Sequence, residues 1–495
     1  MSAGAATLAA CASTSRQALA RETPLASEFD AAIASILALD VTPGLAVAVY
    51  TPEGGYVRAF GVTDIQTGER ADADTAFYIA SSTKPLTALA LAILHERGEL
   101  DLDSTLAAYA PEAPFPAAVR PNDVTLRQML AHTHGIENSP IGYRSAYTGQ
   151  HDPDTLWRLL AQSEVNDEAP LGQFQYTNVG YNIATVLTDR RLGVRWQDLL
   201  DREVFAPLGM RRTSARMSTA QAGGWKVAKP HEAFTGARER VYLEKTDQTM
   251  QSAGGVITSA NDALRWLEIM VRDGRLGARQ IVSPEVVAAT RAQLATMDGD
   301  VFDFNRTSYG LGWYRGAFRD DVIYHHFGGF AGFGAHVSYM PARGVGVAAF
   351  TNGGFTGNAA IHTFANYVYN RTGYDDADAR LEALIENRRG MLAQFAQRGA
   401  ADRANRVTRQ WTLSRPRAAY AGVYESDIWG RMEVSLEGEA IIAEYGVMRA
   451  TAEPFTQPDS IRVEFAPGQG EPILFQGDGD RPSALRTRNG VFARV

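Results

Sequence analysis

Cysteine and lysine are scarce in this chain. Cys11 is the only cysteine among the 495 residues, so no disulfide bond can form within the chain. Lysine occurs only as Lys84, Lys226, Lys229 and Lys245, and arginine supplies the remaining positive charge. The formal net charge of −8 disfavours nucleic-acid binding, because the chain has no basic stripe to displace counterions from phosphates. Because lysine is so scarce, a motif that contains lysine is less often accidental here than in most chains.

Several common functional signatures are also absent. No apolar run is long enough to cross a membrane. No glycine-rich phosphate loop follows the first strand pair, and no G-x-S-x-G elbow of an α/β-hydrolase occurs. His132 and His134 lack an H-E-x-x-H pattern or acidic partners, so the sequence predicts neither a metal site nor a cofactor.

Residues 1–27 are expected to form a leader or a disordered tail. The first twenty are rich in Ala, Ser and Thr, and Leu8-Ala9-Ala10-Cys11 resembles a bacterial lipobox, in which the cysteine is lipidated. No basic region and no full apolar stretch precede this segment, which leaves two interpretations. A leader with a truncated start predicts a lipid anchor at Cys11 and a periplasmic or cell-envelope location. An alanine-rich tail leaves a cytoplasmic location open.

Hydrophobic patterns predict an α/β fold of the α+β type for residues 28–375, with an antiparallel sheet, flanking helices and a helical insertion between about 100 and 245. The predicted strands are 45–50, 56–62, 323–326, 334–340 and 345–351, and the predicted helices are 86–94, 124–130, 154–160, 181–192, 196–208, 259–271 and 359–369. Residues 376–415 are charged and predict a helical linker. Residues 416–495 contain short alternating runs separated by Gly, Pro and Asp, which predict a small all-β, barrel-like domain.

Ser81 and Lys84 form the first candidate catalytic pair. A serine hydroxyl needs a base to become a nucleophile, and a lysine three residues later on a helix presents its amine on the same face. If this lysine is buried, its neutral form is favoured and can accept a proton. Ser81 lies at or just before a helix N-terminus, which supports negative charge developing beside it. The alternative is an N-capping serine followed by a solvated lysine.

Tyr176 and Asn178 form the second candidate element. A tyrosine between Ser81 and Lys84 could accept the serine proton, with its pKa lowered by the neighbouring ammonium group. Asn178 could donate to the substrate and bind Lys84. The alternative is a packing tyrosine followed by a helix-capping asparagine.

The third candidate element is His326-Phe327-Gly328-Gly329, which ends a predicted strand. The glycines allow the backbone to approach a ligand closely, and the amides of Gly329 and Ser81 could form an oxyanion hole. His326 would then face the site, whereas His325 would point to the opposite face of the strand. The alternative is a glycine-rich hairpin with a structural histidine.

The order S-x-x-K, Y-x-N, H-x-G along residues 28–372 resembles the family that joins class C β-lactamases, DD-peptidases, D-aminopeptidases and esterases of the same fold. Further segments resemble that family, namely 42–49, 130–136, 207–210, 252–256, 309–313 and 351–353. The resemblance implies a β-lactamase/transpeptidase-like fold and a serine hydrolase that forms an acyl-enzyme on Ser81. Lys84 and Tyr176 would move protons, and Asn178, His326, Gly328 and Gly329 would bind substrate. The tail is similar to barrel modules that follow this domain in some members.

One departure bears on the substrate. Penicillin-specific members of the family usually carry K-T-G as the third element, and its lysine helps to hold the substrate carboxylate. Here His326 is a weaker, pH-dependent cation, and Phe327 lacks a hydroxyl. We therefore expect poor penicillin hydrolysis and a small ester or amide substrate. The alternatives are a D-amino-acid peptide or peptidoglycan-type substrate, and a non-catalytic, penicillin-binding-like scaffold.

Overall fold

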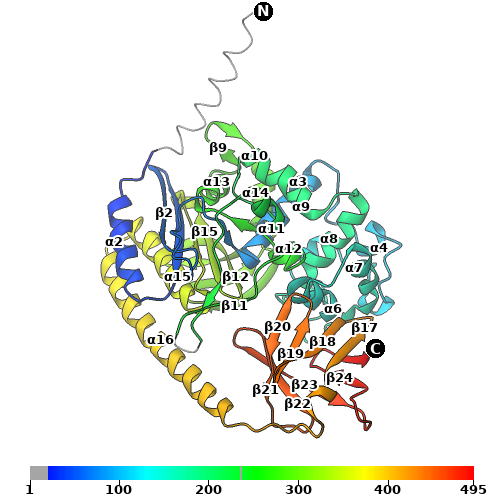
Figure 1. The fold of residues 1–495 in the computed structure, drawn as a ribbon. Coiled ribbons are helices and arrows are strands. Elements are labelled where there is room, and N and C mark those ends of the chain that lie inside the picture. Colours follow the sequence, from blue (N-terminus) through cyan, green and yellow to red (C-terminus); the bar gives the residue numbers. More distant parts are fainter. Residues whose placement is uncertain (1–20, 235–236) are drawn as a thin grey trace, which may run out of the picture.

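The computed structural model describes residues 21–234 and 237–495. Residues 1–20, with the lipobox-like segment and Cys11, lie outside the described residues. Figure 1 shows a mixed helix-and-sheet body, a long helix that runs along its side, and a separate β-structure that contains the C-terminus. No helix in the described part is both long enough and apolar enough to cross a membrane.

One antiparallel sheet of eight strands organises the body, in the order β11-β12-β13-β14-β15-β16-β1-β2. The strands are β1 (Gly44–Thr51), β2 (Gly54–Gly61), β11 (Ala295–Val301), β12 (Phe304–Tyr309), β13 (Tyr314–Phe318), β14 (Asp321–Phe330), β15 (Phe333–Met340) and β16 (Val345–Thr351). The first strand of the chain pairs with β16, Val47 lying opposite Ala349, so both ends of residues 28–375 share one sheet. The predicted antiparallel sheet is therefore confirmed, with β11 to β13 as strands that the sequence patterns did not predict.

Helices cover both faces of this sheet. On one face α2 (Ala26–Leu37) and α15 (Gly354–Arg371) bury Phe29, Phe364 and their neighbours against β1, β15 and β16. On the other face α13 (Ala260–Val271) packs against β1 and β16, and α3 (Lys84–Glu96) belongs to the same apolar core. Burial of apolar surface on both faces makes the sheet a rigid support for the short segments at its edge.

The insertion between α3 and α13 consists of short helices, as predicted. They are α4 (Leu106–Tyr109), α5 (Leu126–Leu130), α6 (Ser139–Tyr143), α7 (Pro153–Leu159), α8 (Val179–Leu192), α9 (Trp196–Leu200), α10 (Ala206–Leu208), α11 (Met217–Ala222) and α12 (Gln251–Gly254), and α14 (Pro284–Thr290) follows α13. A π-helical turn, η3 (Arg144–Thr148), extends α6, and another, η5 (Asp201–Phe205), links α9 to α10. The predicted helix 196–208 is thus confirmed, with a π-helical turn at its centre.

Helix α16 (Ala377–Val407) leads from the body to a second β-structure (Figure 1). That structure is an antiparallel sheet of nine strands, in the order β20-β19-β18-β17-β25-β24-β23-β22-β21, and contact between β20 and β22 curls it into a nearly closed barrel. Its strands are β17 (Gly422–Ser426), β18 (Gly430–Glu437), β19 (Ala440–Tyr445), β20 (Met448–Thr451), β21 (Glu453–Pro454), β22 (Ser460–Ala466), β23 (Gln469–Gln476), β24 (Ala484–Arg486) and β25 (Val491–Arg494). Alternate residues such as Met432 and Val434 point inward and form its own apolar core.

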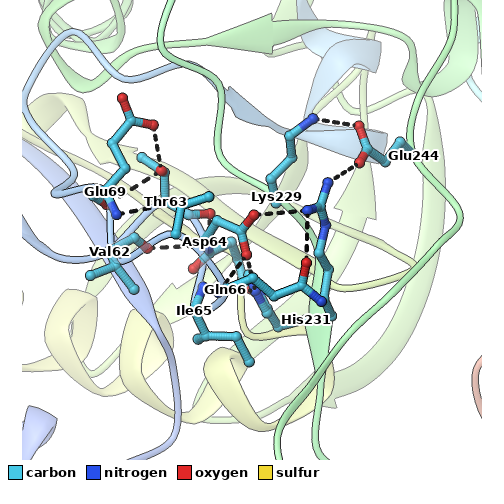
Figure 2. A network of polar contacts seen from close by, with 12 residues as sticks. Val62, Thr63, Asp64, Ile65, Gln66, Glu69, Lys229, His231 and Glu244 are labelled. Carbon is cyan, nitrogen blue, oxygen red and sulfur yellow. Dashed lines mark hydrogen bonds and ion pairs between the residues drawn. The ribbon is translucent and has the colours of Figure 1, made fainter.

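A buried polar network joins the segment after β2 to residues 229–244 (Figure 2). Asp64 is 4% exposed and pairs with Arg240 at 2.8 Å, while Glu244 pairs with both Arg240 and Lys229 at 2.7 Å. The Ile65 amide donates to Nε2 of His231, so that ring nitrogen acts as an acceptor and the imidazole is neutral. Because a buried carboxylate without partners is costly, Asp64 and Arg240 hold these two segments together.

Helix α13 begins at a cap that the sequence predicted. The hydroxyl of Ser259 accepts a hydrogen bond from the Asp262 amide at 3.2 Å. Ser259→Ala should therefore lower the free energy of unfolding by about 1 kcal/mol, measured by urea titration. Ser35→Ala, at an exposed position inside α2, is the matched control and should change that free energy by less than about 0.5 kcal/mol. Equal effects of the two changes would contradict the cap.

Candidate active site

Ser81 lies in a short 3-10 turn, η1 (Ala80–Thr83), which runs directly into α3. This turn is held between β14 and the Ala253 region of α12. Ala80, just before Ser81, has a φ of +44°, a conformation that costs free energy for a residue other than glycine. A strained conformation of this kind persists only where the surrounding structure holds it in place. Here the strained residue directly precedes Ser81 and sets the path of the backbone into it.

The amine of Lys84 is buried and contacts three oxygen atoms. Its Nζ lies 3.2 Å from Ser81 Oγ, 2.8 Å from Asn178 Oδ1 and 2.9 Å from the carbonyl oxygen of Ala253. Burial lowers the pKa of Lys84 well below its usual 10.5, which favours the neutral amine. A neutral amine has two N–H donors and one lone pair. If the neutral amine donates to Asn178 and Ala253, its lone pair is left to accept from the Ser81 hydroxyl.

Tyr176 lies on the other side of the same pair. Lys84 Nζ is 4.7 Å from the centre of the Tyr176 ring. Although 36% of the surface of Tyr176 is exposed, burial of its hydroxyl raises the pKa well above 10, and the hydrogen bond with Ser81 lowers it only in part. The prediction that the Lys84 ammonium lowers this pKa is therefore wrong, because Lys84 favours its neutral form. Tyr176 is a phenol that can donate a proton.

Asn178 immediately precedes α8 but makes no capping hydrogen bond with its side chain. Its Oδ1 accepts from Lys84 instead, so the structural alternative of a helix cap does not apply. This contact brings the start of α8 to the lysine amine and fixes one edge of the site.

Strand β14 brings the third element beside the nucleophile turn. The Ser82 hydroxyl donates to the carbonyl oxygen of His326 at 3.1 Å. The His326 ring lies 5.9 Å from the Tyr176 ring, while its Nδ1 donates to the Phe327 carbonyl. Burial holds the pKa of His326 well below 6.5, and the nearby charge of Arg306 lowers it further. His326 is thus neutral, and the expectation that it acts as a pH-dependent cation is wrong.

Gly328 and Gly329 differ sharply in the space around them. A Cβ at Gly328 would lie 2.0 Å from the Ile79 carbonyl oxygen and 3.1 Å from the Ser81 amide nitrogen, so the strand and the turn are in contact there. A Cβ at Gly329 would meet nothing within 4 Å. The strand therefore touches the nucleophile turn at Gly328, beside the Ser81 amide, and borders open space at Gly329.

Three residues at the site were not predicted individually. The Ala253 carbonyl is an acceptor for Lys84, and Tyr314 stacks on Tyr176 at 6.0 Å between ring centres. Arg306 lies 3.7 Å from the centre of the Tyr314 ring, and no hydrogen bond or ion pair of its guanidinium is found within the described residues. Ala253 lies in the family-like segment 252–256, whereas no sequence signal marks Arg306, because β12 was not recognised as a strand.

His132 and His134 are buried structural residues. His132 contacts the rings of Tyr176, Tyr181 and Tyr309, and its Nδ1 accepts from the Thr177 amide at 3.4 Å. Nδ1 of His134 accepts from the Ile136 amide at 3.0 Å. They support the loop that carries Tyr176, which explains their place in a family-like segment.

The Beta-lactamase family model matches residues 29–371 of this chain. The chain belongs to the Beta-lactamase family. The predicted resemblance to serine hydrolases of this family is therefore confirmed.

Curated relatives cover much of this chain at low identity. Unguisins hydrolase ungD of Aspergillus violaceofuscus is 26% identical over 84% of this chain and 77% of that protein. Penicillin-binding protein 4 of Amycolatopsis lactamdurans is 28% identical over 63% of this chain and 81% of its own length. The D-alanyl-D-alanine-carboxypeptidase/endopeptidase AmpH of Escherichia coli K12 is 24% identical over 61% of this chain and 77% of its own.

Solved structures share the fold. The octameric penicillin-binding protein homologue from Pyrococcus abyssi superposes with a TM-score of 0.61 at 17% identity, covering 94% of this chain and 99% of that one. The D-amino acid amidase from Ochrobactrum anthropi SV3 gives 0.55 at 19% identity, covering 73% of this chain and 99% of its own. The predicted β-lactamase/transpeptidase-like fold class is confirmed.

The two glycines of β14 provide a matched test of the site. Gly328→Ala should force the strand away from the Ser81 turn and lower kcat/KM by about a hundredfold or more, because the oxyanion donors would separate. It should also lower the unfolding midpoint. Gly329→Ala places the same methyl group in open space and should leave that midpoint unchanged. Equal midpoints for the two variants would contradict the close contact at Gly328.

The pH dependence of activity should follow Lys84 and Tyr176. On a neutral ester, kcat/KM should rise as Lys84 loses its proton, well below pH 10.5, and should fall only well above pH 10, where Tyr176 ionises. Lys84→Arg keeps a charge without a usable lone pair and should lower kcat by about a thousandfold. An ascending limb near pH 6.5 that disappears in His326→Asn would instead make His326 the base.

Proposed function

We propose that this protein is a serine hydrolase that cleaves esters or amides through an acyl-enzyme on Ser81. The observation that carries the proposal is the buried amine of Lys84, whose Nζ lies 3.2 Å from Ser81 Oγ and also contacts the Asn178 and Ala253 oxygens. Burial lowers the pKa of this amine well below 10.5. A structural lysine would need a charged partner or solvent, and Lys84 contacts only neutral oxygen atoms within the described residues.

In the first step Lys84 accepts the Ser81 proton while Oγ attacks the substrate carbonyl. The amides of Ser81 and Gly329 hold the oxyanion that forms, since Gly329 borders the open side of the turn. The Tyr176 hydroxyl then gives its proton to the leaving alcohol or amine and recovers one from the Lys84 ammonium. In the second step water attacks the acyl carbonyl and gives one proton to the neutral Lys84 amine. The Lys84 ammonium then returns that proton to Ser81 Oγ as the bond between Oγ and the acyl carbon breaks, which releases the acid and restores Ser81.

The substrate proposed is a small ester or amide. His326, whose pKa burial holds well below 6.5, stands where K-T-G members carry a lysine, which supports slow penicillin hydrolysis. The second candidate is a D-amino-acid or peptidoglycan-type peptidase, which the names of AmpH and the D-amino acid amidase favour. A non-catalytic scaffold is disfavoured because Ser81, Lys84, Tyr176 and Asn178 all meet in one place.

Ser81→Ala should abolish turnover of a nitrophenyl acyl ester, and the adduct seen by intact-mass spectrometry after reaction with a fluorescent phosphonate should disappear. Ser82→Ala is the matched control, because the neighbouring hydroxyl contacts the His326 carbonyl and not Lys84, and it should still form the adduct. Unchanged ester turnover in Ser81→Ala would refute the proposal. A panel of short-chain esters, D-amino-acid amides and a chromogenic cephalosporin separates the substrate classes.

A further inference from the structure

The segment formed by α6 and η3, residues 139–148, spans the gap between two elements of the candidate site. On one side it touches the start of α8, where Asn182 donates to Ser145 Oγ at 2.7 Å and Gly142 faces Val179. On the other side the Tyr147 ring lies 5.9 Å from the Phe330 ring, at the end of β14. The segment therefore lies between α8, which Asn178 immediately precedes, and the end of β14 that follows Gly329.

Two tyrosines form the aromatic surface of this segment. Tyr143 and Tyr147 are both half-buried, and their ring centres lie 5.2 Å apart. Together with Phe330 they form what we call the aromatic wall. Aromatic rings offer a large apolar contact area with few freely rotating bonds, which suits them to binding an apolar group.

The barrel holds the aromatic wall from behind. The Tyr143 ring lies 5.5 Å from that of Tyr445, and the Tyr143 hydroxyl donates to buried Glu471 at 3.3 Å. At the end of the segment the Val447 amide donates to the Thr148 carbonyl at 3.0 Å. The turn at Gly446 fits so closely that a Cβ there would lie 2.0 Å from that same oxygen. The segment has thus no freedom to move toward the barrel.

The direction of β14 decides which part of the substrate meets the wall. His326 lies beside Tyr176, whereas Phe330, four residues along the strand, lies beside Tyr147. The leaving group must lie at the Tyr176 end, because Tyr176 supplies its proton. The acyl group, on the other side of the oxyanion site at Gly329, then lies toward Phe330 and Tyr147.

We propose that the aromatic wall of Tyr143, Tyr147 and Phe330, fixed in place by the barrel turn at Gly446, selects substrates whose acyl part carries an apolar or aromatic side group. This inference rests on the proposed function and assigns the barrel a role in it. The barrel residues are positioning residues, and only the wall contacts the acyl group.

The test varies the acyl group while keeping the leaving group constant. The ratio of kcat/KM for a nitrophenyl phenylacetyl ester to that for nitrophenyl acetate is measured for each variant. Tyr147→Ala should lower this ratio about tenfold, since acetate does not reach the wall. Gly446→Ala should push the segment away at Thr148 and lower the ratio by a similar factor without touching the substrate.

Gly438→Ala is the matched control for the barrel variant. Gly438 lies in another turn of the same barrel with a φ of +61°, against +63° for Gly446, but a Cβ there meets nothing within 4 Å. Both alanine variants therefore carry the same backbone strain, and only Gly446→Ala clashes with the segment. Gly438→Ala should keep the ratio of the unaltered chain, with circular dichroism and thermal melting showing that every variant is folded.

An unchanged ratio in Tyr147→Ala, or equal ratios in Gly446→Ala and Gly438→Ala, would overturn the inference. So would an equal loss on both esters, because that would indicate general disruption of the site. Failure of the proposed function would appear differently, as an unlabelled Ser81 in the unaltered chain. Failure of this inference would appear as unchanged selectivity in a chain whose Ser81 is labelled.

Discussion

The candidate site depends on the burial of the Lys84 amine away from water. Lys84 is fully buried, and in the part of the chain that the structure describes it has no carboxylate partner. A charged ammonium would be costly there, so the neutral base is the stable form at rest. The same burial keeps Tyr176 protonated and His326 uncharged. One buried environment thus shifts the pKa values of three groups, downward for Lys84 and His326 and upward for Tyr176.

The rest of the fold maintains that environment. The antiparallel sheet holds β14 against the nucleophile turn, and the helical insertion supplies Tyr176 and Asn178 from the side. Gly312, with a φ of +85°, allows the turn between β12 and β13 to approach the start of α3, where a Cβ would lie 2.5 Å from the Cα of Pro85. Gly180 similarly allows α8 to approach the Met129 carbonyl and His134. Close packing around the site therefore explains why segments 130–136 and 309–313 resemble the family although they carry no reacting group.

Sequence patterns predicted much of the fold because its core elements are strongly periodic. The strands at β1, β2, β15 and β16 and the helices at α8 and α13 lie within a few residues of their predicted bounds. Strands β11 to β13 were not predicted, because they are short and rich in polar residues, and β13 contains Gly316. Arg306 was missed for that reason. The pKa of Tyr176 was predicted with the wrong sign because the charge of Lys84 depends on burial.

By itself the sequence determined which residues could react, because S-x-x-K, Y-x-N and H-x-G name a hydroxyl, an amine, a phenol and a glycine-rich strand in a fixed order. Only the tertiary structure shows the direction in which each pKa shifts, because a pKa depends on the distances and solvent exposure of groups far apart in the chain. It also decided that the barrel lies against α6 and η3, a contact between residues more than 290 positions apart that no local pattern encodes. Local spacing in the sequence predicts which side chains could react, whereas long-range packing determines how their pKa values shift and which segments surround them.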